Sequence, residues 1–194
     1  MPMTLEGRKI AIIATDGVEQ VELIEPRRAV KEAGATVELL SLSEKEIQAM
    51  NHDIEPAERF EVDRAIADAS PDDYDGLLLP GGTVNADRLR ADEDVVSFVR
   101  DYFRSGKPVG VICHGPWTLV EADVVRGRTL TSYPSLRTDI RNAGGKVVDE
   151  EVVVDQGLVS SRKPDDLPAF CAKVVEEFAE GRHPVASAGA TARA

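Results

Sequence analysis

The stretch Val109-Gly110-Val111-Ile112-Cys113-His114-Gly115-Pro116 decides the fold of this chain. Its first four residues form a short, bounded apolar run, which is typical of a central strand in a parallel sheet. A polar pair follows at once, and then a Gly-Pro sequence that favours the start of a helix. This is the pattern of a nucleophile elbow, in which a sharp turn exposes a reactive side chain. The sequence therefore predicts an α/β sheet with Cys113 at its carboxyl edge.

Strand-like and helix-like segments alternate on both sides of this stretch. Strands are predicted at Lys9–Thr15, Thr36–Leu42, Gly76–Leu79 and Val109–Ile112, and helices at Gln20–Ala33, Asp92–Ser105, Gly115–Ala122, Ser135–Ala143 and Asp165–Ala179. A hairpin is predicted where an Asp-Gln-Gly turn joins Val152–Val154 to Leu158–Ser160. Such alternation indicates a mostly parallel sheet with helices on both faces.

Three segments are less regular. Pro26 lies inside the first helical segment, so we expect that helix to kink or to restart with Pro26 in its first turn. Residues 44–74 are polar and irregular, with a short pair of strands expected before Asp63–Ala69. The segment Gly181–Ala194 is small, polar and rich in alanine. We therefore predict one domain over residues 1–180, followed by a flexible tail over residues 181–194.

Composition and charge exclude several classes of protein. The chain has 194 residues and a formal net charge of −12, which argues against nucleic-acid binding, because that needs clustered Lys and Arg. No apolar run approaches the roughly 18 residues of a membrane span, and the first strand lacks a signal-peptide pattern. The two cysteines, Cys113 and Cys171, form no disulfide framework and no zinc-binding pattern. We expect a cytoplasmic protein with no metal and no cofactor.

Cys113 is the main candidate for chemistry. The positive end of the following helix favours a thiolate and predicts a lowered thiol pKa. The alternative is a small buried thiol at a strand end, because free cysteines are often part of a core. His114 is either the general base or mainly the source of a backbone N–H group. Glycine after the strand Gly76–Leu79 allows close approach, so the N–H groups of Gly82 and His114 would form an oxyanion hole.

Acidic and aromatic residues near the same edge are candidates for supporting roles. Glu19 and Glu22 lie three positions apart at the start of the first helix and share one face. They are either solvated partners of the helix dipole or acids of the site. An acid beside Cys113 would share a proton with it and would need a raised pKa. Trp117 walls the pocket or simply packs, and Asp87 reaches the site or lies on the surface.

The other cysteine and histidines are expected to play no part in the chemistry. Cys171 follows helical spacing with neighbouring apolar residues, which places it on the buried face of the last helix as inert core. His52 and His183 lie in polar segments and are expected to be solvated. Of these two, only His52 has a chance of lining the site, from a loop.

Taken together, these segments resemble the ThiJ/PfpI superfamily, and most closely its PfpI branch, which includes intracellular protease I and general stress proteins. The resemblance covers residues from about 8 to 180. It is carried by Asp16–Leu23, Leu79–Gly82, Gly106–Pro108, Ile112–Pro116, Arg126–Arg128, Thr131–Pro134, Asn142–Gly144, Glu151–Asp155 and the pattern Ser161-Arg162-x-Pro164-x-Asp166-Leu167. It implies a flavodoxin-like three-layer sandwich that assembles into dimers or larger homo-oligomers.

The resemblance also implies roles for individual residues. Cys113 matches the family's nucleophile and oxidisable thiol, Glu22 the acid bonded to that sulfur, Glu19 a second acid, His114 the neighbouring histidine, Gly82 the oxyanion donor and Tyr133 an aromatic neighbour. One position departs from the pattern. Asp87 lies in the stretch where the archaeal protease of the family has a glutamate that completes a triad in a neighbouring subunit, and this weakens a peptidase interpretation. The chain also lacks the His-x-Glu pair of the related glutamine amidotransferases.

Two kinds of function follow from this resemblance. The first is an enzyme of stress response that acts on methylglyoxal and on its early adducts with proteins and nucleotides, as a glyoxalase or deglycase. Its substrate would be a small aldehyde or a glycated protein, and peptide hydrolysis is a weaker variant. The second is a redox-sensing protein whose Cys113 is oxidised to sulfenic and sulfinic acid.

Overall fold

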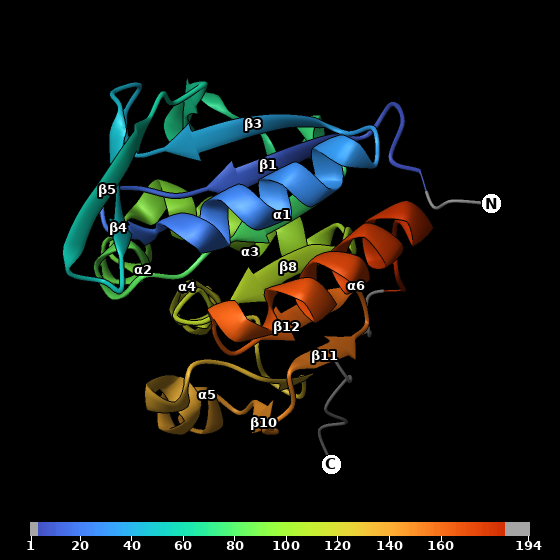
Figure 1. The fold of residues 1–194 in the computed structure, drawn as a ribbon. Coiled ribbons are helices and arrows are strands. Elements are labelled where there is room, and N and C mark those ends of the chain that lie inside the picture. The colour runs from blue at the N-terminus through green and yellow to red at the C-terminus, as the bar shows by residue number, and fades with distance from the viewer. Residues whose placement is uncertain (1–3, 185–194) are drawn as a thin grey trace, which may run out of the picture.

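The computed structural model describes residues 4–184, and a seven-stranded sheet lies at its centre (Figure 1). The strand order is β11 (Val152–Asp155), β12 (Leu158–Ser161), β8 (Val109–Ile112), β7 (Gly76–Leu79), β1 (Lys9–Ile13), β3 (Thr36–Ser41) and β6 (Arg64–Ala65). All neighbours pair in parallel except β11 with β12, which form the predicted antiparallel hairpin. The α/β class and the mostly parallel sheet that the sequence predicts are therefore confirmed.

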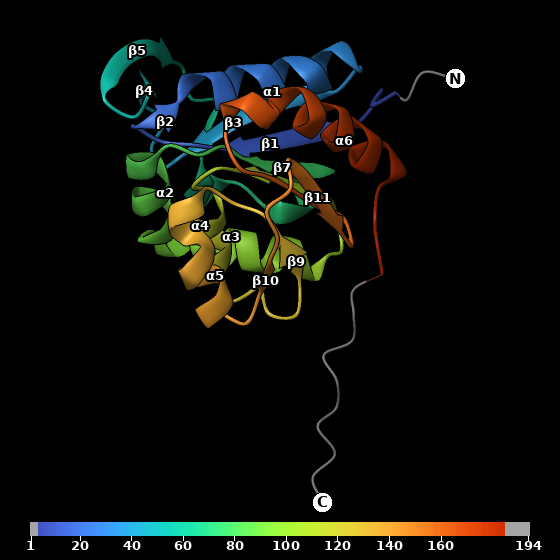
Figure 2. The same ribbon diagram turned by 60° about the horizontal axis from the view of Figure 1, so that its bottom comes forward.

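Helices cover both faces of this sheet, so the molecule has three layers (Figure 2). One face carries α1 (Gln20–Glu32) and α6 (Leu167–Glu180), and the other carries α2 (Thr83–Arg90), α3 (Glu93–Arg104), α4 (Pro116–Glu121) and α5 (Arg137–Asn142). Successive residues of β1 pack into the two cores in turn, because strand side chains alternate between faces. Ile10 and Ile12 belong to the cluster with Phe170 of α6, whereas Ala11 and Ile13 belong to the cluster with Val99 of α3.

The sequence predicts that the first helix either kinks at Pro26 or restarts there. Helix α1 runs through Pro26 without a break, so it does not restart. Pro26 is buried, together with Glu22, Leu23 and Val30 on the face that packs inward. Proline lacks an N–H group, so the helix has one intrahelical hydrogen bond fewer at this point.

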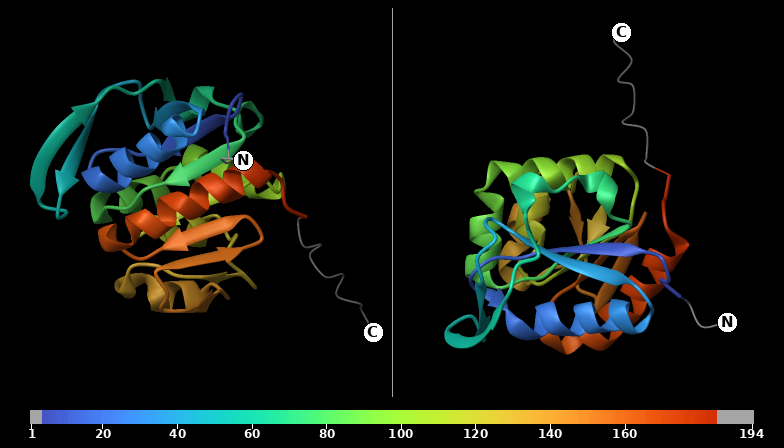
Figure 3. Two further views of the ribbon diagram at one scale, coloured as in Figure 1. Left: turned by 45° about the vertical axis from the view of Figure 1, so that its right-hand side comes forward. Right: turned by 90° about the horizontal axis from the view of Figure 1, so that it is seen from above.

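Residues 44–74 contain the β-hairpin of β4 (Ile47–Asn51) and β5 (Glu55–Phe60), which is the strand pair expected before Asp63–Ala69. This hairpin projects from the body in the left panel of Figure 3 and pairs with β2 (Val18–Glu19). Several other elements were not predicted from the sequence. Short 3-10 turns follow at Ile66–Asp68 and Pro71–Asp73. Helix α2 was not predicted, and neither was the strand pair of β9 (Thr129–Leu130) and β10 (Lys146–Val147).

The chain remains attached to the body beyond α6. His183 donates its backbone N–H group to the carbonyl oxygen of Gly106 over 2.8 Å, and its ring packs against Gly157. Residues 181–184 of the predicted tail are therefore held in place, and residues 185–194 lie outside the described part of the chain. The division into one domain and a flexible tail stays a prediction.

The carboxyl ends of the parallel strands position the functional residues. The loops after β1, β7 and β8 meet at one edge of the sheet, where ligands bind in open α/β folds. The right panel of Figure 3 shows this sheet between its two helical layers.

Among the described residues, no helix is long and apolar enough to cross a membrane.

Candidate active site

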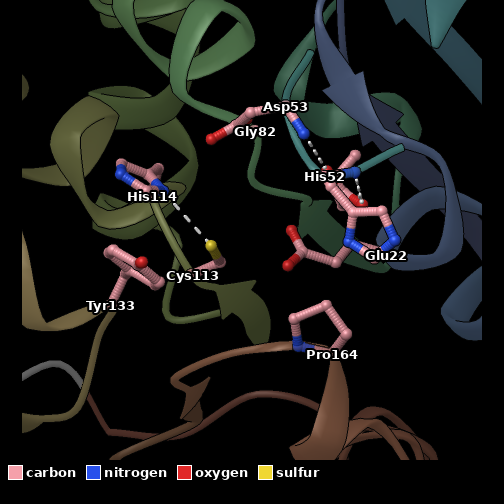
Figure 4. Close-up of a pocket in the computed structure, with 9 residues that line it drawn as sticks. Glu22, His52, Asp53, Gly82, Cys113, His114, Tyr133 and Pro164 are labelled. Carbon is pink, nitrogen blue, oxygen red and sulfur yellow. Dashed lines mark hydrogen bonds between the residues drawn. The ribbon is translucent and has the colours of Figure 1, made fainter. Parts of the chain in front are cut away.

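Cys113 lies at the sharp turn between β8 and α4. Its φ of 61° is in the left-handed region, which costs a residue other than glycine about 1–3 kcal/mol. Two backbone hydrogen bonds hold it there: its N–H group donates to the Ser161 carbonyl over 3.1 Å, and its carbonyl accepts from the Tyr133 N–H group over 3.0 Å. The strained conformation directs the sulfur into the pocket at the sheet edge (Figure 4).

Two glycines allow the neighbouring backbone to approach this turn. A Cβ atom on Gly81 would lie 2.5 Å from Glu22 Oε2 and 2.7 Å from Cys113 Cβ. A Cβ atom on Gly115 would lie 2.6 Å from the carbonyl oxygen of Leu79. Both distances are too short for real side-chain contacts, so only glycine fits without a shift of the backbone.

The backbone N–H groups of Gly82 and His114 both interact with the Cys113 sulfur and favour a negative charge on it. Gly82 has a φ of 91°, and a Cβ atom there would collide with the carbonyl oxygen of Gly17. Two convergent N–H donors beside a nucleophile are the arrangement of an oxyanion hole. The two donors thus lie where the sequence predicts them.

Glu22 projects from the first turn of α1, and its carboxyl group lies against the Cys113 sulfur. Its Oε2 atom accepts a hydrogen bond from the Gly81 N–H group over 2.8 Å. Its Oε1 atom is buried and has no partner of standard hydrogen-bond geometry among residues 4–184. Burial raises the pKa of Glu22 to about 8, against the opposing effect of the Gly81 N–H group. Glu22 is therefore mostly protonated at neutral pH, as an acid beside Cys113 was expected to be.

The Cys113 thiol does not have the lowered pKa that a helix N-terminus predicts. Burial and the charge of ionised Glu22 raise the pKa of the thiol, and the N–H groups of Gly82 and His114 only partly oppose them. Helix α4 is six residues long and begins with Pro116, which has no N–H group, so its dipole has little influence. The thiol is therefore protonated at neutral pH, and a thiolate requires a neighbouring base that takes its proton.

His114 is well placed to be that base. Its Nδ1 atom lies 3.2 Å from the Cys113 sulfur. Its ring stacks on Tyr133 with centroids 4.6 Å apart, and meets Trp117 edge-on at 5.4 Å. Burial lowers the pKa of His114, so its imidazole is neutral at pH 7 and can accept a proton.

These groups share one open cavity of about 290 Å³. Its lining residues come from β2, the first turn of α1, the β4–β5 hairpin, the β7–α2 turn, the elbow, and the segments before α5 and α6: Glu19, Glu22, His52, Asp53, Gly82, Cys113, His114, Tyr133 and Pro164 (Figure 4). The cavity brings most of the predicted site residues together around one sulfur atom.

The supporting residues divide into those in the cavity and those outside it. Tyr133 lines the cavity as predicted, and so does Glu19, but the Glu19 carboxylate accepts hydrogen bonds from the backbone of the hairpin turn. Trp117 lies behind His114 and donates its indole N–H group to Asp139 over 2.9 Å. Asp87 is exposed on α2 and does not line the cavity. Of the two alternatives given for it, Asp87 therefore lies on the surface of its own chain.

Sequence analysis missed three residues of the site. Asp53 belongs to the segment that was assigned as irregular, Thr83 begins a helix that was not predicted, and Pro164 belongs to the loop before α6. Pro164 lies in the Ser161-Arg162-x-Pro164 motif, which was a usable signal. No local signal marks Asp53 or Thr83, because their roles depend on the hairpin and α2 meeting in space.

Cys171 occupies a different environment. It lies on α6 in a surface groove with Glu25, Arg28 and Pro168, on the border of the apolar face. It is half-buried rather than fully buried, which corrects the expectation that it belongs to the core. Burial raises the pKa of Cys171 to about 11.

Within residues 4–184, one group of side chains has a spacing that would suit a metal ion. The ligand atoms of Glu177, Glu180 and His183 lie within 4.8 Å of one another, at the opposite end of α6 from the pocket. His183 Nε2 lies 3.1 Å from Glu177 Oε2, so a protonated His183 forms an ion pair there. This cluster is separate from the chemistry at Cys113.

The fold and the site define a class: α/β proteins with a cysteine at a strand-to-helix elbow, beside a buried carboxylic acid. Comparison with known proteins then identifies the family. The chain belongs to the DJ-1/PfpI family, whose model matches residues 8–177.

Curated relatives cover most of the chain. General stress protein 18 of Bacillus subtilis (strain 168) is 45% identical over 165 residues, and protein/nucleic acid deglycase 2 of Escherichia coli (strain K12) is 43% identical over 165 residues. Each match spans 84% of this chain and 94% of the relative. Among solved structures, Drosophila melanogaster DJ-1beta has a TM-score of 0.80 at 28% identity, covering 89% of this chain and 90% of its own. The resemblance inferred from the motifs is therefore confirmed.

Proposed function

We propose that this protein is a cysteine-dependent enzyme that acts on methylglyoxal and on early glycation adducts, with Cys113 as its nucleophile. One observation carries the proposal: two N–H donors, a buried carboxylic acid and a neutral imidazole converge on one sulfur atom in an open cavity. The cavity of about 290 Å³ is large enough for a small dicarbonyl. Two relatives named as a deglycase and as a general stress protein support the same kind of chemistry.

The first step is addition of sulfur to the aldehyde carbon. His114 Nδ1 takes the thiol proton across 3.2 Å as the sulfur forms its bond to C1 of methylglyoxal. The carbonyl electrons move to the oxygen of C1, which the Gly82 and His114 N–H groups stabilise. Glu22, protonated because its pKa is about 8, donates its proton to that oxygen and gives a neutral hemithioacetal.

The remaining steps transfer hydrogen within the substrate. The Glu22 carboxylate removes the proton from C1 to give an enediolate, and returns a proton to C2 while the hydroxyl proton moves to the second oxygen. The product is a lactoyl thioester of Cys113, in which C1 has been oxidised and C2 reduced, so no external oxidant is needed. Water then attacks C1 and gives one proton to the Glu22 carboxylate. The C1–S bond breaks, the His114 imidazolium returns its proton to the sulfur, and lactate leaves as the second water proton passes to solvent. A pKa near 8 allows Glu22 to act in both directions.

Oxidative sensing is the second candidate, and one observation favours it. The free Oε1 atom of Glu22 lies beside the Cys113 sulfur and could accept a hydrogen bond from a sulfenic acid. Cys171 lies on the outer side of α1 and α6, so it cannot resolve that sulfenic acid as a disulfide. Peptide hydrolysis is a third, weaker variant, because the shorter acid Asp87 lies in the stretch where the archaeal protease of the family has a glutamate.

The proposal extends to the setting of the enzyme. We expect a homodimer or larger homo-oligomer in the cytoplasm, and small aldehydes or glycated proteins as substrates. Whether Asp87 approaches a neighbouring subunit's cavity depends on that assembly.

The direct test is lactate production from methylglyoxal. The purified full-length protein should form lactate over many turnovers, and Cys113→Ser and Glu22→Gln should both lose this activity. Glu25→Gln is the matched control for the second variant, because Glu25 lies one turn further along α1 and outside the cavity. Stoichiometric trapping of methylglyoxal with no lactate would overturn the enzyme proposal and favour redox sensing.

A further inference from the structure

A chain of polar contacts leads from the β4–β5 hairpin to the Cys113 sulfur. Asp53 Oδ2 lies 2.6 Å from Thr83 Oγ1, and Thr83 Oγ1 lies 3.4 Å from His114 Nε2. His114 Nδ1 lies 3.2 Å from Cys113 Sγ. The four side chains come from three separate segments of the chain: the hairpin turn, the start of α2 and the elbow.

The protons along this chain can be assigned by counting donors. The Thr83 hydroxyl has one proton, and its short contact with an acceptor-only carboxylate shows that this proton points to Asp53. Towards His114 the hydroxyl oxygen can then only accept, so His114 Nε2 carries a hydrogen. Burial lowers the pKa of His114, so the ring is neutral and Nδ1 holds a lone pair directed at the thiol.

We propose that Asp53 is a positioning residue that, through Thr83, fixes His114 in the Nε2–H tautomer, so that Nδ1 takes the proton of Cys113. This inference rests on the proposed function only in taking Cys113 as the nucleophile. Asp53 lines the cavity, but its side-chain hydrogen bonds go to Thr83 and not to the Cys113 sulfur. Its negative charge also favours the imidazolium that forms once the proton has moved.

The hairpin turn is built to hold Asp53 in this position. His52 and Asp53 have φ angles of 53° and 65°, both in the left-handed region. The Glu19 carboxylate accepts hydrogen bonds from both of their N–H groups, over 2.9 Å and 3.0 Å. Asp53 Oδ1 in turn accepts from the backbone N–H group of Thr83 over 2.8 Å. Glu19 therefore acts on the site through the hairpin.

Ser135 is the other hydroxyl near His114 Nε2, at 3.4 Å. Ser135 is exposed, and its hydroxyl can either donate or accept. It accepts from Nε2 when Thr83 is held by Asp53, and it offers no charge to fix the tautomer. Asp53 and Thr83, not Ser135, therefore set the direction of the hydrogen bonds.

The substitution Asp53→Asn tests this direction, because the two contacts of Asp53 with Thr83 determine how the amide must lie. The Thr83 backbone N–H group is always a donor, so the asparagine oxygen must face it, and the NH₂ group then faces the Thr83 hydroxyl. The hydroxyl accepts from that amide and donates its own proton to His114 Nε2. We expect His114 to switch to the Nδ1–H tautomer, which cannot take the thiol proton.

Two readouts separate this role from a structural one. Nitrogen-15 NMR of the histidine side chains, assigned with His114→Gln, reports the tautomer in the absence of substrate. Alkylation by iodoacetamide in a Cys171→Ser background reports the proton transfer from Cys113. Alkylation at neutral pH should be at least about tenfold slower in Asp53→Asn than in the wild type. The pH at which alkylation reaches half its maximal rate should also be higher in the variant. For lactate formation kcat should fall while KM is unchanged.

Further variants keep the proposal open to refutation if Asp53→Asn unfolds. Thr83→Val removes the hydroxyl and should slow alkylation, whereas Thr83→Ser keeps it and should behave like the wild type. Glu55→Gln, on the exposed part of the same hairpin, is the matched control. An unchanged tautomer with unchanged alkylation in Asp53→Asn, or equal behaviour of the two Thr83 variants, would overturn the inference. A normal tautomer switch without any lactate formation in the wild type would instead refute the proposed reaction alone.

Discussion

The two cysteines of this chain have raised thiol pKa values, yet their surroundings differ in every other respect. Cys113 has a strained backbone, two N–H donors on its sulfur and a buried acid beside it. Cys171 lies in a regular helix, in a surface groove beside Glu25 and Arg28, which form an ion pair with each other. Burial raises the pKa of both thiols, and that of Cys113 more than that of Cys171, so a lowered pKa is not what sets Cys113 apart. Reactivity is set by the groups that receive the proton and stabilise the developing charge.

Helix α1 carries the same contrast in its acids. Glu22 faces Cys113 from the buried side, and Glu25, one turn later, lies near Cys171 at the surface. The pKa of Glu22 is raised to about 8 because the residue is buried, whereas Glu25 is paired with Arg28. A single helix thus presents a protonated acid to one thiol and a solvated ion pair to the other. The following variants exploit that contrast, from the largest expected effect to the smallest.

The largest effect is expected from exchanging the thiols themselves. Cys113→Ser should reduce lactate formation by more than about a thousandfold, because the hydroxyl is a far weaker nucleophile in a site built for sulfur. Cys171→Ser should leave the rate close to that of the wild type. Steady-state kinetics of both variants would check this, and a comparable loss in Cys171→Ser would remove the distinction between the two thiols.

Glu22→Gln should change how stability depends on pH. The folded pKa of about 8 lies above the unfolded value of 4.5, so the protonated form contributes stability that is full below pH 4.5 and is lost as the pH rises towards 8. Glutamine cannot ionise, so above that range the free energy of unfolding of the variant should exceed that of the wild type by on the order of 5 kcal/mol. Urea unfolding at about pH 5 and pH 9 measures the difference. Glu25→Gln should show no such gain, and an equal gain in both would contradict the buried acid.

Gly81→Ala should disturb only the Cys113 site. Its Cβ atom would lie 2.5 Å from Glu22 Oε2 and 2.7 Å from Cys113 Cβ, so the backbone that precedes Gly82 must shift. Loss of one well-placed donor typically costs about a hundredfold in kcat. Gly127 has a positive φ, unlike Gly81, and open space around it, so Gly127→Ala is the control for backbone strain without a steric contact. Equal activity of the two variants would show that the close approach at Gly81 is unimportant.

Arg162→Met tests the loop between the two thiols and should have the smallest effect. Arg162 donates hydrogen bonds from Nε and Nη2 to the Asp166 carboxylate, over 2.9 and 3.0 Å. Asp166 directly precedes α6, and Pro164 of the cavity lies between the two residues. Burial raises the pKa of Asp166, but the bonds and charge of Arg162 outweigh this, so its pKa is lowered. The ion pair therefore stabilises the fold at pH values above the ordinary pKa of an aspartate. This stabilisation is lost as the pH falls through the lowered pKa of Asp166. At neutral pH the free energy of unfolding of the variant, measured with urea, should be lower by about 1–2 kcal/mol. An unchanged free energy of unfolding would show that the ion pair does not stabilise the fold.

The sequence was sufficient for the parts of the site that are local. The apolar run at Val109–Ile112 and the elbow at Cys113 were predicted because strand ends of a parallel sheet gather at one edge. The residues alone left Glu22 open between a solvated partner of the helix dipole and an acid of the site, and the family resemblance assigned it to the sulfur. Helix α2 was missed because Thr83–Arg90 is mostly polar and its only buried residues are Asn85, Ala86 and Leu89. Amphipathic spacing therefore gave no signal there.

The rest of the site depends on contacts between distant segments. Asp53 meets Thr83 only because the β4–β5 hairpin folds over the start of α2, a contact between residues 30 positions apart. Cys171 was placed in the core by its helical spacing, but α6 meets α1 at that point through the charged edge of α1. The lowered pKa expected for Cys113 failed for a similar reason, because burial in the assembled site outweighs the dipole of a short helix.

The account is tested most directly by locating the covalent adduct during turnover. Protein mixed with methylglyoxal would be quenched at successive times and digested, and mass spectrometry would measure the adduct on the peptides that contain Cys113 and Cys171. The account predicts an adduct on Cys113 that appears before lactate, stays at a steady level during turnover and disappears when the substrate is consumed. Lactate formed with no adduct on Cys113, or an equal adduct on Cys171, would contradict it.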